Sequence, residues 1–350
     1  MYAYILDNRN LGVKDVLEYE EYNFQWDIDY DDKSSITVVR KPNIEDNDFV
    51  VCKDGNEIVF QGICGNCAVA SDRESYTISL MQIEQLFSRQ IFVGDESLIS
   101  GMGIEDFVAS EIQANFVSSG DWLTDKTYIK VTVGTHTPIA AKVDTENGIY
   151  NLKTYLGNVR QYYGICLDFS FIGDRLDIEI RKCGLGQLPI DTGVSDITDY
   201  DETYEVSALA KLIVQWKVPD TEAADGPLTT RTFYLLADRT ITEDGMDGNR
   251  AMGVIRSLYI ETKEEAEMLQ QVYNEFAGNT YNHKIAFSIR KGSQCYPEPE
   301  FPIGRKCLIK TCTGVKASMV TGMTKKSTSE LLRITMGNLK VTLIEKLRRR

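Results

Sequence analysis

The sequence has few of the residues on which common catalytic and metal sites depend. Its 350 residues include two histidines. Neither His136 nor His283 has a second histidine four residues away, or an acidic residue at the spacing of a metal motif. The serine-nucleophile motif of hydrolases, the phosphate-binding P-loop and a paired-carboxylate signature are also absent. We therefore expect no enzyme, no cofactor and no metal, although distant residues can still assemble a catalytic triad.

Long hydrophobic runs and a secretory signal are missing as well. No stretch approaches the roughly 18 apolar residues of a membrane-spanning helix, so we expect no membrane insertion. The first residues, MYAYILDNRN, carry neither a basic region nor a small-residue cleavage site. This N-terminus favours synthesis in the cytoplasm.

The eight cysteines do not suggest a disulfide framework in a chain of this length. Cys64 and Cys67 form the one CxxC pair, and a zinc ribbon would need a second. The nearest other pair, Cys307 and Cys312, lies inside a predicted strand. Inert thiols are the main expectation, with metal binding and redox chemistry as the alternatives.

The last fifty residues carry the clearest pattern that is present. Apolar and polar residues alternate over 315–319, 332–336 and 339–343, and a period of two places all apolar side chains on one face of a strand. Gly337-Asn338 and Thr313-Gly314 supply the tight turns between strands. The segment predicts an antiparallel β-unit with one buried face.

A stretch near the N-terminus has the same layout. A strand at 48–53, a turn at 54–56, a strand ending at Gly62 and a strand at 76–81 follow one another. The distance from the turn glycine to the next glycine is seven residues here, from Gly55 to Gly62, and eight in the C-terminal stretch, from Gly314 to Gly322. We interpret this layout as a duplicated β-domain.

The middle of the chain mixes helices with strands. Helical spacing marks 104–116 and 149–163, the second capped by Asn147 and ended by Gly164, and a hairpin follows. Residues 182–192 are predicted to be a linker. Further strands are expected at 204–218 and 229–237. A helix opened by a capping box at Thr262 and Glu265 precedes a strand at 284–289.

Charge is unevenly distributed. The formal net charge is −14, but residues 304–350 hold 12 Lys/Arg against 2 Asp/Glu, a net of +10, which leaves −24 for the remainder. An acidic surface disfavours nucleic-acid binding, because phosphate contacts need Lys and Arg. The basic end is either a solvated strand face or a seam against an acidic neighbouring subunit. Asp27, Asp29 and Asp31 are assigned to the outward face of a strand rather than to a calcium loop.

These features resemble one known family. The opening MYAYILDNRNLGVKDV, the strands FQWDIDY and IVFQGI, and the ending PIGRKCLIK…GNLKVTLIEKL are similar to the trimeric baseplate hub of long-tailed phages. The similarity extends to the hub part of tail-associated lysins in prophages of Gram-positive bacteria. It implies a mainly β protein with two similar β-barrel-like tube domains and two smaller inserted domains. The implied boundaries are 1–93 and 189–237 with 284–350 for the tube domains, and 94–188 and 238–283 for the inserts.

The resemblance also implies a function and partners. Three chains would form a ring that adapts the six-fold tail tube, or a distal tail protein, to a three-fold tip, spike or fibre. DNA would pass through its bore without specific binding, and the protein, made in the bacterial host's cytoplasm, would lie at the virion tail tip. The charge pattern suggests interface residues between subunits: Asp27, Asp29, Asp31, Lys340, Lys346 and Arg348.

Two other classes of function stay open. The chain could be a fragment of a cell-wall hydrolase, in which case substitution of His136 or His283 would abolish activity. It could also be a receptor-binding module whose 94–188 insert contacts glycans through Trp122 and Tyr128, although both aromatics also suit a domain core. The chain stops at 346–350, so it is either a short family member or a truncated lysin, and lytic activity would lie outside it.

Overall fold

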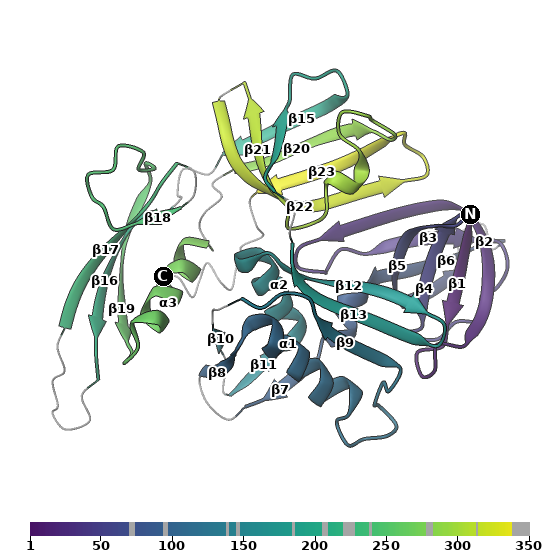
Figure 1. Ribbon diagram of the computed structural model, residues 1–350. Helices are drawn as coiled ribbons and strands as arrows, with labels where there is room; N and C mark the ends of the chain where they lie inside the picture. Colours follow the sequence, from purple (N-terminus) through teal and green to yellow (C-terminus); the bar gives the residue numbers. More distant parts are fainter. Residues whose placement is uncertain are drawn as a thin grey trace. The chain divides into compact units, whose positions relative to one another are not determined.

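The computed structural model describes residues 1–337 except for 70–73, 94–96, 138–139, 145–147, 184–185, 205–208, 220–227, 238–239, 278–282 and 313. Strands dominate it (Figure 1). The predicted fold class, mainly β with α+β inserts, is confirmed. The predicted last strand at 339–343 lies outside the described residues, as do Lys340, Lys346 and Arg348. Among the described helices, none is both long and apolar enough to cross a bilayer.

The first six strands form a closed barrel. The ladder runs β1-β4-β5-β6-β3-β2 and returns from β2 to β1. Inward-facing side chains alternate with outward-facing ones and fill its interior, among them Ile5, Phe24 and Phe60. Gly55, with φ of +59°, makes the predicted turn between the fourth and fifth strands. The strands are β1 (Tyr2–Leu6), β2 (Val13–Asp27), β3 (Ser34–Val38), β4 (Phe49–Asp54), β5 (Glu57–Val69) and β6 (Tyr76–Gln82).

Six later strands pair in the same order. When each set is numbered from one to six along the chain, both ladders read 1-4-5-6-3-2. One difference is that β14 runs parallel to β21, whereas β1 runs antiparallel to β4. The strands of this second set are β14 (Leu188–Asp191), β15 (Ile197–Tyr204), β20 (His283–Arg290), β21 (Lys306–Thr311), β22 (Gly314–Lys326) and β23 (Leu331–Gly337).

The glycine spacing that suggested a duplication is not equivalent in the two sets. Gly62 pairs with Val50 in the β4–β5 hairpin, but Gly322 pairs with Asp27 of β2. The residue of β22 that matches Gly62 in register is Ser318, opposite Cys307. The bulge in β5 opposite Cys52 and Lys53 shifts its register by one residue relative to the regular β21–β22 hairpin. Gly322 lies four residues beyond Ser318, so the bulge does not make the two glycines equivalent.

The chain forms two compact units, defined by residues that contact one another densely. Unit 1 holds 1–185, 289–305 and 322–334, and unit 2 holds 186–288, 306–321 and 335–350. Three strands, β20, β22 and β23, therefore each contribute residues to both units. Within unit 1, the end of β22 pairs with β2, with Met323 opposite Trp26.

Unit 1 also contains the predicted α+β segment. Helix α1 (Ile104–Ile112) continues as a π-helical turn, Gln113–Val117, and α2 (Leu152–Tyr163) ends at Gly164 in the left-handed conformation. Asn151, rather than the predicted Asn147, caps α2 by accepting from the backbone N–H of Thr154 at 3.2 Å. Residues 149–151 lie in a strand instead. The other elements are η1 (Ile83–Phe87), β7 (Gln90–Phe92), β8 (Ser97–Gly103), β9 (Ile129–Val133), β10 (Ala140–Asp144), β11 (Ile149–Asn151), β12 (Ile165–Ile172) and β13 (Arg175–Lys182).

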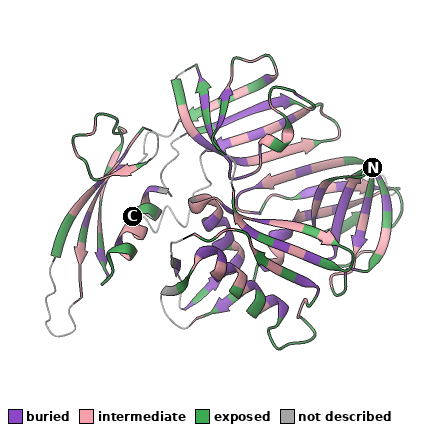
Figure 2. Ribbon diagram, viewed as in Figure 1, coloured by how far each residue is buried: buried purple, intermediate pink, exposed green. Residues whose placement is uncertain are grey.

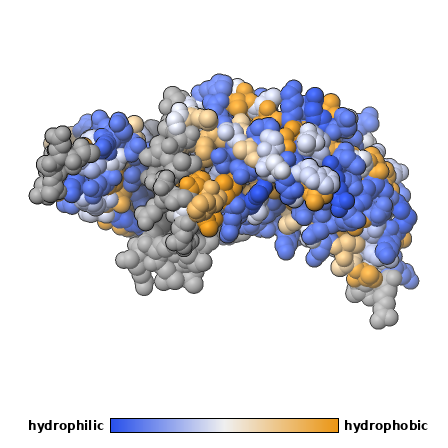
Figure 3. Space-filling view, turned by 90° about the horizontal axis from the view of Figure 1, so that it is seen from below, coloured by the Kyte–Doolittle hydropathy of each residue, from blue (hydrophilic) through white to orange (hydrophobic). Residues whose placement is uncertain are grey.

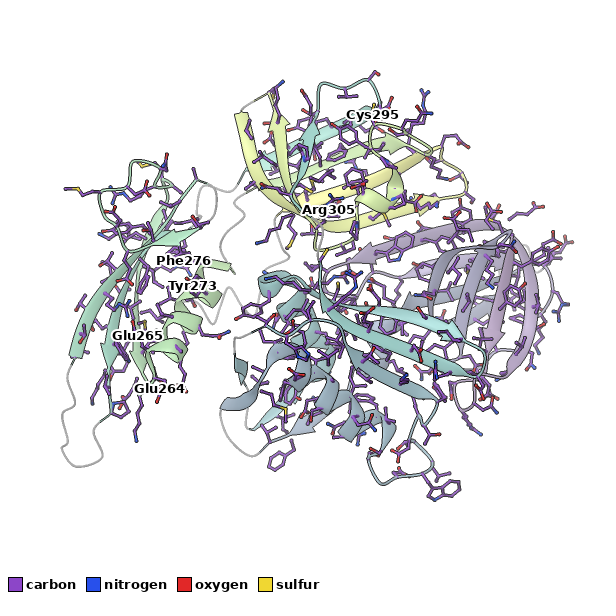
Figure 4. All side chains as sticks on the ribbon, viewed as in Figure 1. Glu264, Glu265, Tyr273, Phe276, Cys295 and Arg305 are labelled. Carbon is purple, nitrogen blue, oxygen red and sulfur yellow. The ribbon has the colours of Figure 1, made fainter. Side chains whose placement is uncertain are left out.

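In unit 2, four strands and a helix form a separate layer pair. The ladder β18-β17-β16-β19 comprises β16 (Leu209–Lys217), β17 (Leu228–Leu235), β18 (Ile241–Thr242) and β19 (Val254–Glu261). Helix α3 (Glu265–Ala277) packs on one face through Phe276, while Tyr273 is half exposed (Figures 2 and 4).

This layer pair corrects two predictions. The strands predicted at 204–218 and 229–237 were assigned to the second barrel, but β16 and β17 pair with β19 and β18 instead. The insert predicted for 238–283 as small and helical is therefore part of a helix-covered sheet. Residues 182–192 also include strand β14 rather than a plain linker. A period of two predicts a strand but not its partner, which explains these errors.

Candidate assembly surfaces

An exposed strip with negative charge runs along β1 and β2, and we call it the acidic ridge. Leu17 and Tyr19 of β2 point into the barrel, so the residues between and beside them face outward. Apolar side chains are exposed on the same strands, with exposed fractions of 49% for Tyr2 and 63% for Val13. The three glutamates of the ridge form no ion pair within the described part of the chain. The ridge consists of Tyr2, Val13, Val16, Glu18, Glu20 and Glu21.

A second exposed strip, which we call the basic ridge, lies on β21 and the start of β22. Cys307 and Ile309 are buried while Lys306, Leu308 and Lys310 face outward. Val315 of β22 pairs with Lys310 and is 61% exposed. Lys310 Nζ lies 2.9 Å from Asp191 Oδ2, and Lys306 has no ion pair among the described residues. The basic ridge consists of Lys306, Leu308, Lys310 and Val315.

The three predicted interface aspartates occupy different environments. Strand β2 ends at Asp27, whose buried carboxylate accepts a hydrogen bond from Gln82 Nε2 at 2.8 Å. The prediction that Asp27 lies on an outward strand face is therefore wrong. Asp29 follows in a turn and is partly exposed. Asp31 is exposed, and its Oδ1 lies 2.7 Å from Lys153 Nζ. The structure does not gather them into one surface, and their role at an interface stays a prediction.

The two histidines lie in different units, His136 in unit 1 and His283 in unit 2. His136 is exposed, and its Nδ1 lies 2.9 Å from Asp106 Oδ2, which raises the pKa of the imidazole. His283 begins β20 with its Nε2 3.0 Å from Ser318 Oγ. This Ser–His pair resembles half of a catalytic triad. Both residues are 1% exposed, however, so a substrate in solution cannot reach them.

The cysteines of the CxxC pair differ in exposure. Cys64 is buried in β5, and burial raises the pKa of its thiol to about 12. Cys67, on the same strand, is exposed. A thiol held protonated is a poor nucleophile and a poor metal ligand. Among the described residues, no three His, Cys, Asp or Glu side chains gather as metal ligands would.

The two aromatics proposed for glycan contact do not form one platform. Tyr128 is 9% exposed and packs in the core of unit 1, where its hydroxyl donates to the carbonyl of Asn8 at 2.7 Å. Trp122 is 82% exposed. Its loop is held by backbone N–H groups that donate to carboxylates, from Ser119 to Asp125 at 2.8 Å and from Leu123 to Asp121 at 3.1 Å.

Sequence reasoning missed a buried charged cluster in unit 1. Arg160 of α2 donates from Nε to the carbonyl of Ile303 at 3.3 Å and lies 5.4 Å from the ring centroid of Tyr30. Its Nη1 is 3.8 Å from Glu84 Oε1, and burial raises the pKa of Glu84 although Arg160 opposes the rise. Arg160 occupies an ordinary place in the last turn of a predicted helix, so no sequence signal marks it.

The fold is shared with known proteins although the sequence is not. No protein-family model matches the chain, and a search of curated proteins gives no significant match. Among solved structures, the prophage tail protein gp18 from Listeria monocytogenes EGD-e superposes with a TM-score of 0.58 at 12% identity, covering 99% of this chain and 98% of that one. A tail protein from Neisseria meningitidis MC58 gives 0.55 at 10% identity and 96% coverage of both chains.

A third structure supports the same assignment. The 43 kDa tail protein of prophage MuSo2 from Shewanella oneidensis gives a TM-score of 0.54 at 12% identity, covering 96% of this chain and 98% of that one. Coverage is nearly complete in each pair, so the likeness extends along nearly the whole chain rather than over one barrel alone. The chain has the fold of phage and prophage tail proteins, as its resemblance to the baseplate hub implied.

Proposed function

We propose that this protein is a structural component of a phage or prophage tail tip, a baseplate hub that assembles as a trimer. The observation that carries the proposal is the strand order 1-4-5-6-3-2, which occurs twice in one chain. Three copies of such a chain contain six related strand sets. In a closed ring of three chains, these six strand sets are related by pseudo-six-fold symmetry.

The doubled strand set allows a three-fold ring to bind a six-fold tail tube. A tail tube built from six-fold rings can dock on six related barrels, while the inserts keep the three-fold symmetry of the chains. In this proposal, residues 1–93 supply one ring domain, and β14, β15 and β20–β23 supply the other. Residues 94–188 and the layer pair with α3 lie at the periphery. A tip, spike or fibre protein binds the three-fold side.

The charge distribution is compatible with a bore for DNA. The net charge of −14 disfavours adhesion of phosphates, so DNA can pass without specific binding. The surface view in Figure 3 is mainly hydrophilic, with hydrophobic residues interspersed. A structural role also fits the buried Ser318–His283 pair, which substrate cannot reach.

Mass measurement of the purified full chain tests the proposal. Native mass spectrometry should give a species of three times the 39.5 kDa chain mass, in equilibrium with monomer on dilution. A chain that stays monomeric at the highest attainable concentration would contradict the trimer. As a check on the hydrolase alternative, the protein should release no soluble fragments from purified peptidoglycan.

A further inference from the structure

We propose that the acidic ridge of one copy binds the basic ridge of the next copy. This inference rests on the proposed trimer and names the surfaces that close it. The two ridges carry opposite charges but have a similar composition, because each places exposed charged side chains beside exposed apolar ones. On the acidic ridge these are three glutamates beside Tyr2, Val13 and Val16, and on the basic ridge two lysines beside Leu308 and Val315.

Among the residues that the structure describes, the charges on the two ridges lack strong partners. Glu18, Glu20 and Glu21 form no ion pair in the described residues, and Lys306 forms none either. Lys310 pairs with Asp191, but its side chain is 66% exposed, so solvent weakens that pair. Exposed charges of opposite sign on two separate surfaces of one chain are complementary between copies.

The location of the ridges favours a head-to-tail contact. The acidic ridge belongs to the first strand set and the basic ridge to the second, so a contact between them always joins unlike sets. Such a heterologous contact closes into a ring when its rotation permits, and the two sets then alternate around it. The apolar side chains supply the buried area, while the charges fix register and reject like surfaces.

Charge reversal followed by restoration tests the inference on the full-length protein. The first variant carries Glu18→Lys, Glu20→Lys and Glu21→Lys, and the second carries Lys306→Glu and Lys310→Glu. Each alone should weaken trimer formation more than about tenfold, because like charges then face each other. The combined variant should regain the trimer, since the charges are again complementary. The control Glu264→Lys, at an exposed position just before α3, should leave the trimer unchanged.

Mixing the two single-ridge variants adds a test of closure. Unlike variants are complementary in both directions, but a ring of three cannot alternate two kinds of subunit without one repulsive contact. The mixture should therefore form open dimers of one copy of each variant, with fewer closed trimers than wild type, and trimers as abundant as in wild type would overturn the ridge contact. A circular dichroism melt of each variant confirms that it is folded.

The outcomes separate this inference from the proposed function. Trimers that form normally in both folded single-ridge variants would overturn the ridge contact while leaving the hub proposal intact. Loss without restoration in the combined variant would also overturn it. A wild-type chain that never trimerises would overturn the proposed function, and the ridge contact with it.

Discussion

Lys53 and Lys310 hold the same place in two different strand sets. Each is the fifth residue of its strand, β4 or β21, and each pairs across a hairpin with an exposed branched side chain, Ile58 or Val315. Only the bulge in β5 interrupts the match. A shared strand order can arise from general preferences of β-sheets. A matched register of outward-facing residues is stronger support for a duplicated strand set.

Replacement of Arg160 should destabilise unit 1 severely. Arg160→Ala removes the hydrogen bond to Ile303 and leaves the buried carboxyl of Glu84 without its cation, which costs about 3–5 kcal/mol. Urea unfolding measures the loss. The double variant Arg160→Met with Glu84→Gln should recover most of it, because no uncompensated charge remains buried. A loss of less than about 1 kcal/mol in Arg160→Ala would contradict this role.

Glu105 should make stability depend on pH. Burial alone would raise the pKa of this carboxyl, but hydrogen bonds from Thr137 and Thr135 outweigh burial and lower it. A depressed folded pKa stabilises the protein above the unfolded value of about 4.3, and this stability is lost as pH falls through the folded value. Glu105→Gln should therefore be less stable than wild type at neutral pH, by about 1–3 kcal/mol.

The difference between wild type and Glu105→Gln should narrow on acidification. Chemical denaturation at a series of pH values from about 6 down to about 3 measures it. The exposed Glu57→Gln serves as the control and should change little. A difference that stays constant over this range would show that the carboxylate's ionisation is not what stabilises the fold.

Substitution of Tyr128 should lower the stability of the protein, whereas substitution of Trp122 should change it little. Tyr128→Phe removes the hydroxyl that donates to the Asn8 carbonyl at 2.7 Å, which leaves Lys126 Nζ at 3.2 Å as the donor to that carbonyl. The loss of this hydrogen bond should cost about 1 kcal/mol. Trp122→Ala should stay within about 0.5 kcal/mol of wild type, because the side chain is 82% exposed. Thermal melts compare the two variants. A large destabilisation by Trp122→Ala would mean that this side chain is packed in solution.

The cysteines should react with alkylating reagents in the order of their exposure. Burial raises the pKa of Cys52 and Cys64 to about 12, so both should stay unmodified in the native protein. Peptide mass spectrometry after brief maleimide treatment should find label on the exposed Cys67, Cys295 and Cys312 (Cys295 is marked in Figure 4). Modification of Cys64 as fast as Cys67 would contradict the closed barrel.

Sequence patterns predicted local elements well where a single strand or helix carries its own signal. The strand at 76–81, the turn at Gly55 and the end of α2 at Gly164 all follow from side-chain period and backbone freedom. These patterns did not predict which strands pair with one another. Strands β16 and β17 have an ordinary alternation that does not specify a partner, but they pair with β19 and β18 and share a hydrophobic core with α3.

The site residues were harder to predict for the same reason. Asp27 alternates in sequence like an outward residue, but β2 ends there and Gln82 draws its carboxylate inward. The exposed glutamates of β2 and lysines of β21 carry no motif. They become a candidate surface only when the barrel shows which side of each strand faces solvent.

Electron microscopy of the purified trimer tests the central claim most directly. If two strand sets per chain let three copies imitate six, class averages down the ring axis should contain six similar lobes around a central opening. The same particles should show three-fold features at their rim. A closed particle with three lobes, or an open chain of subunits with no central opening, would contradict the account.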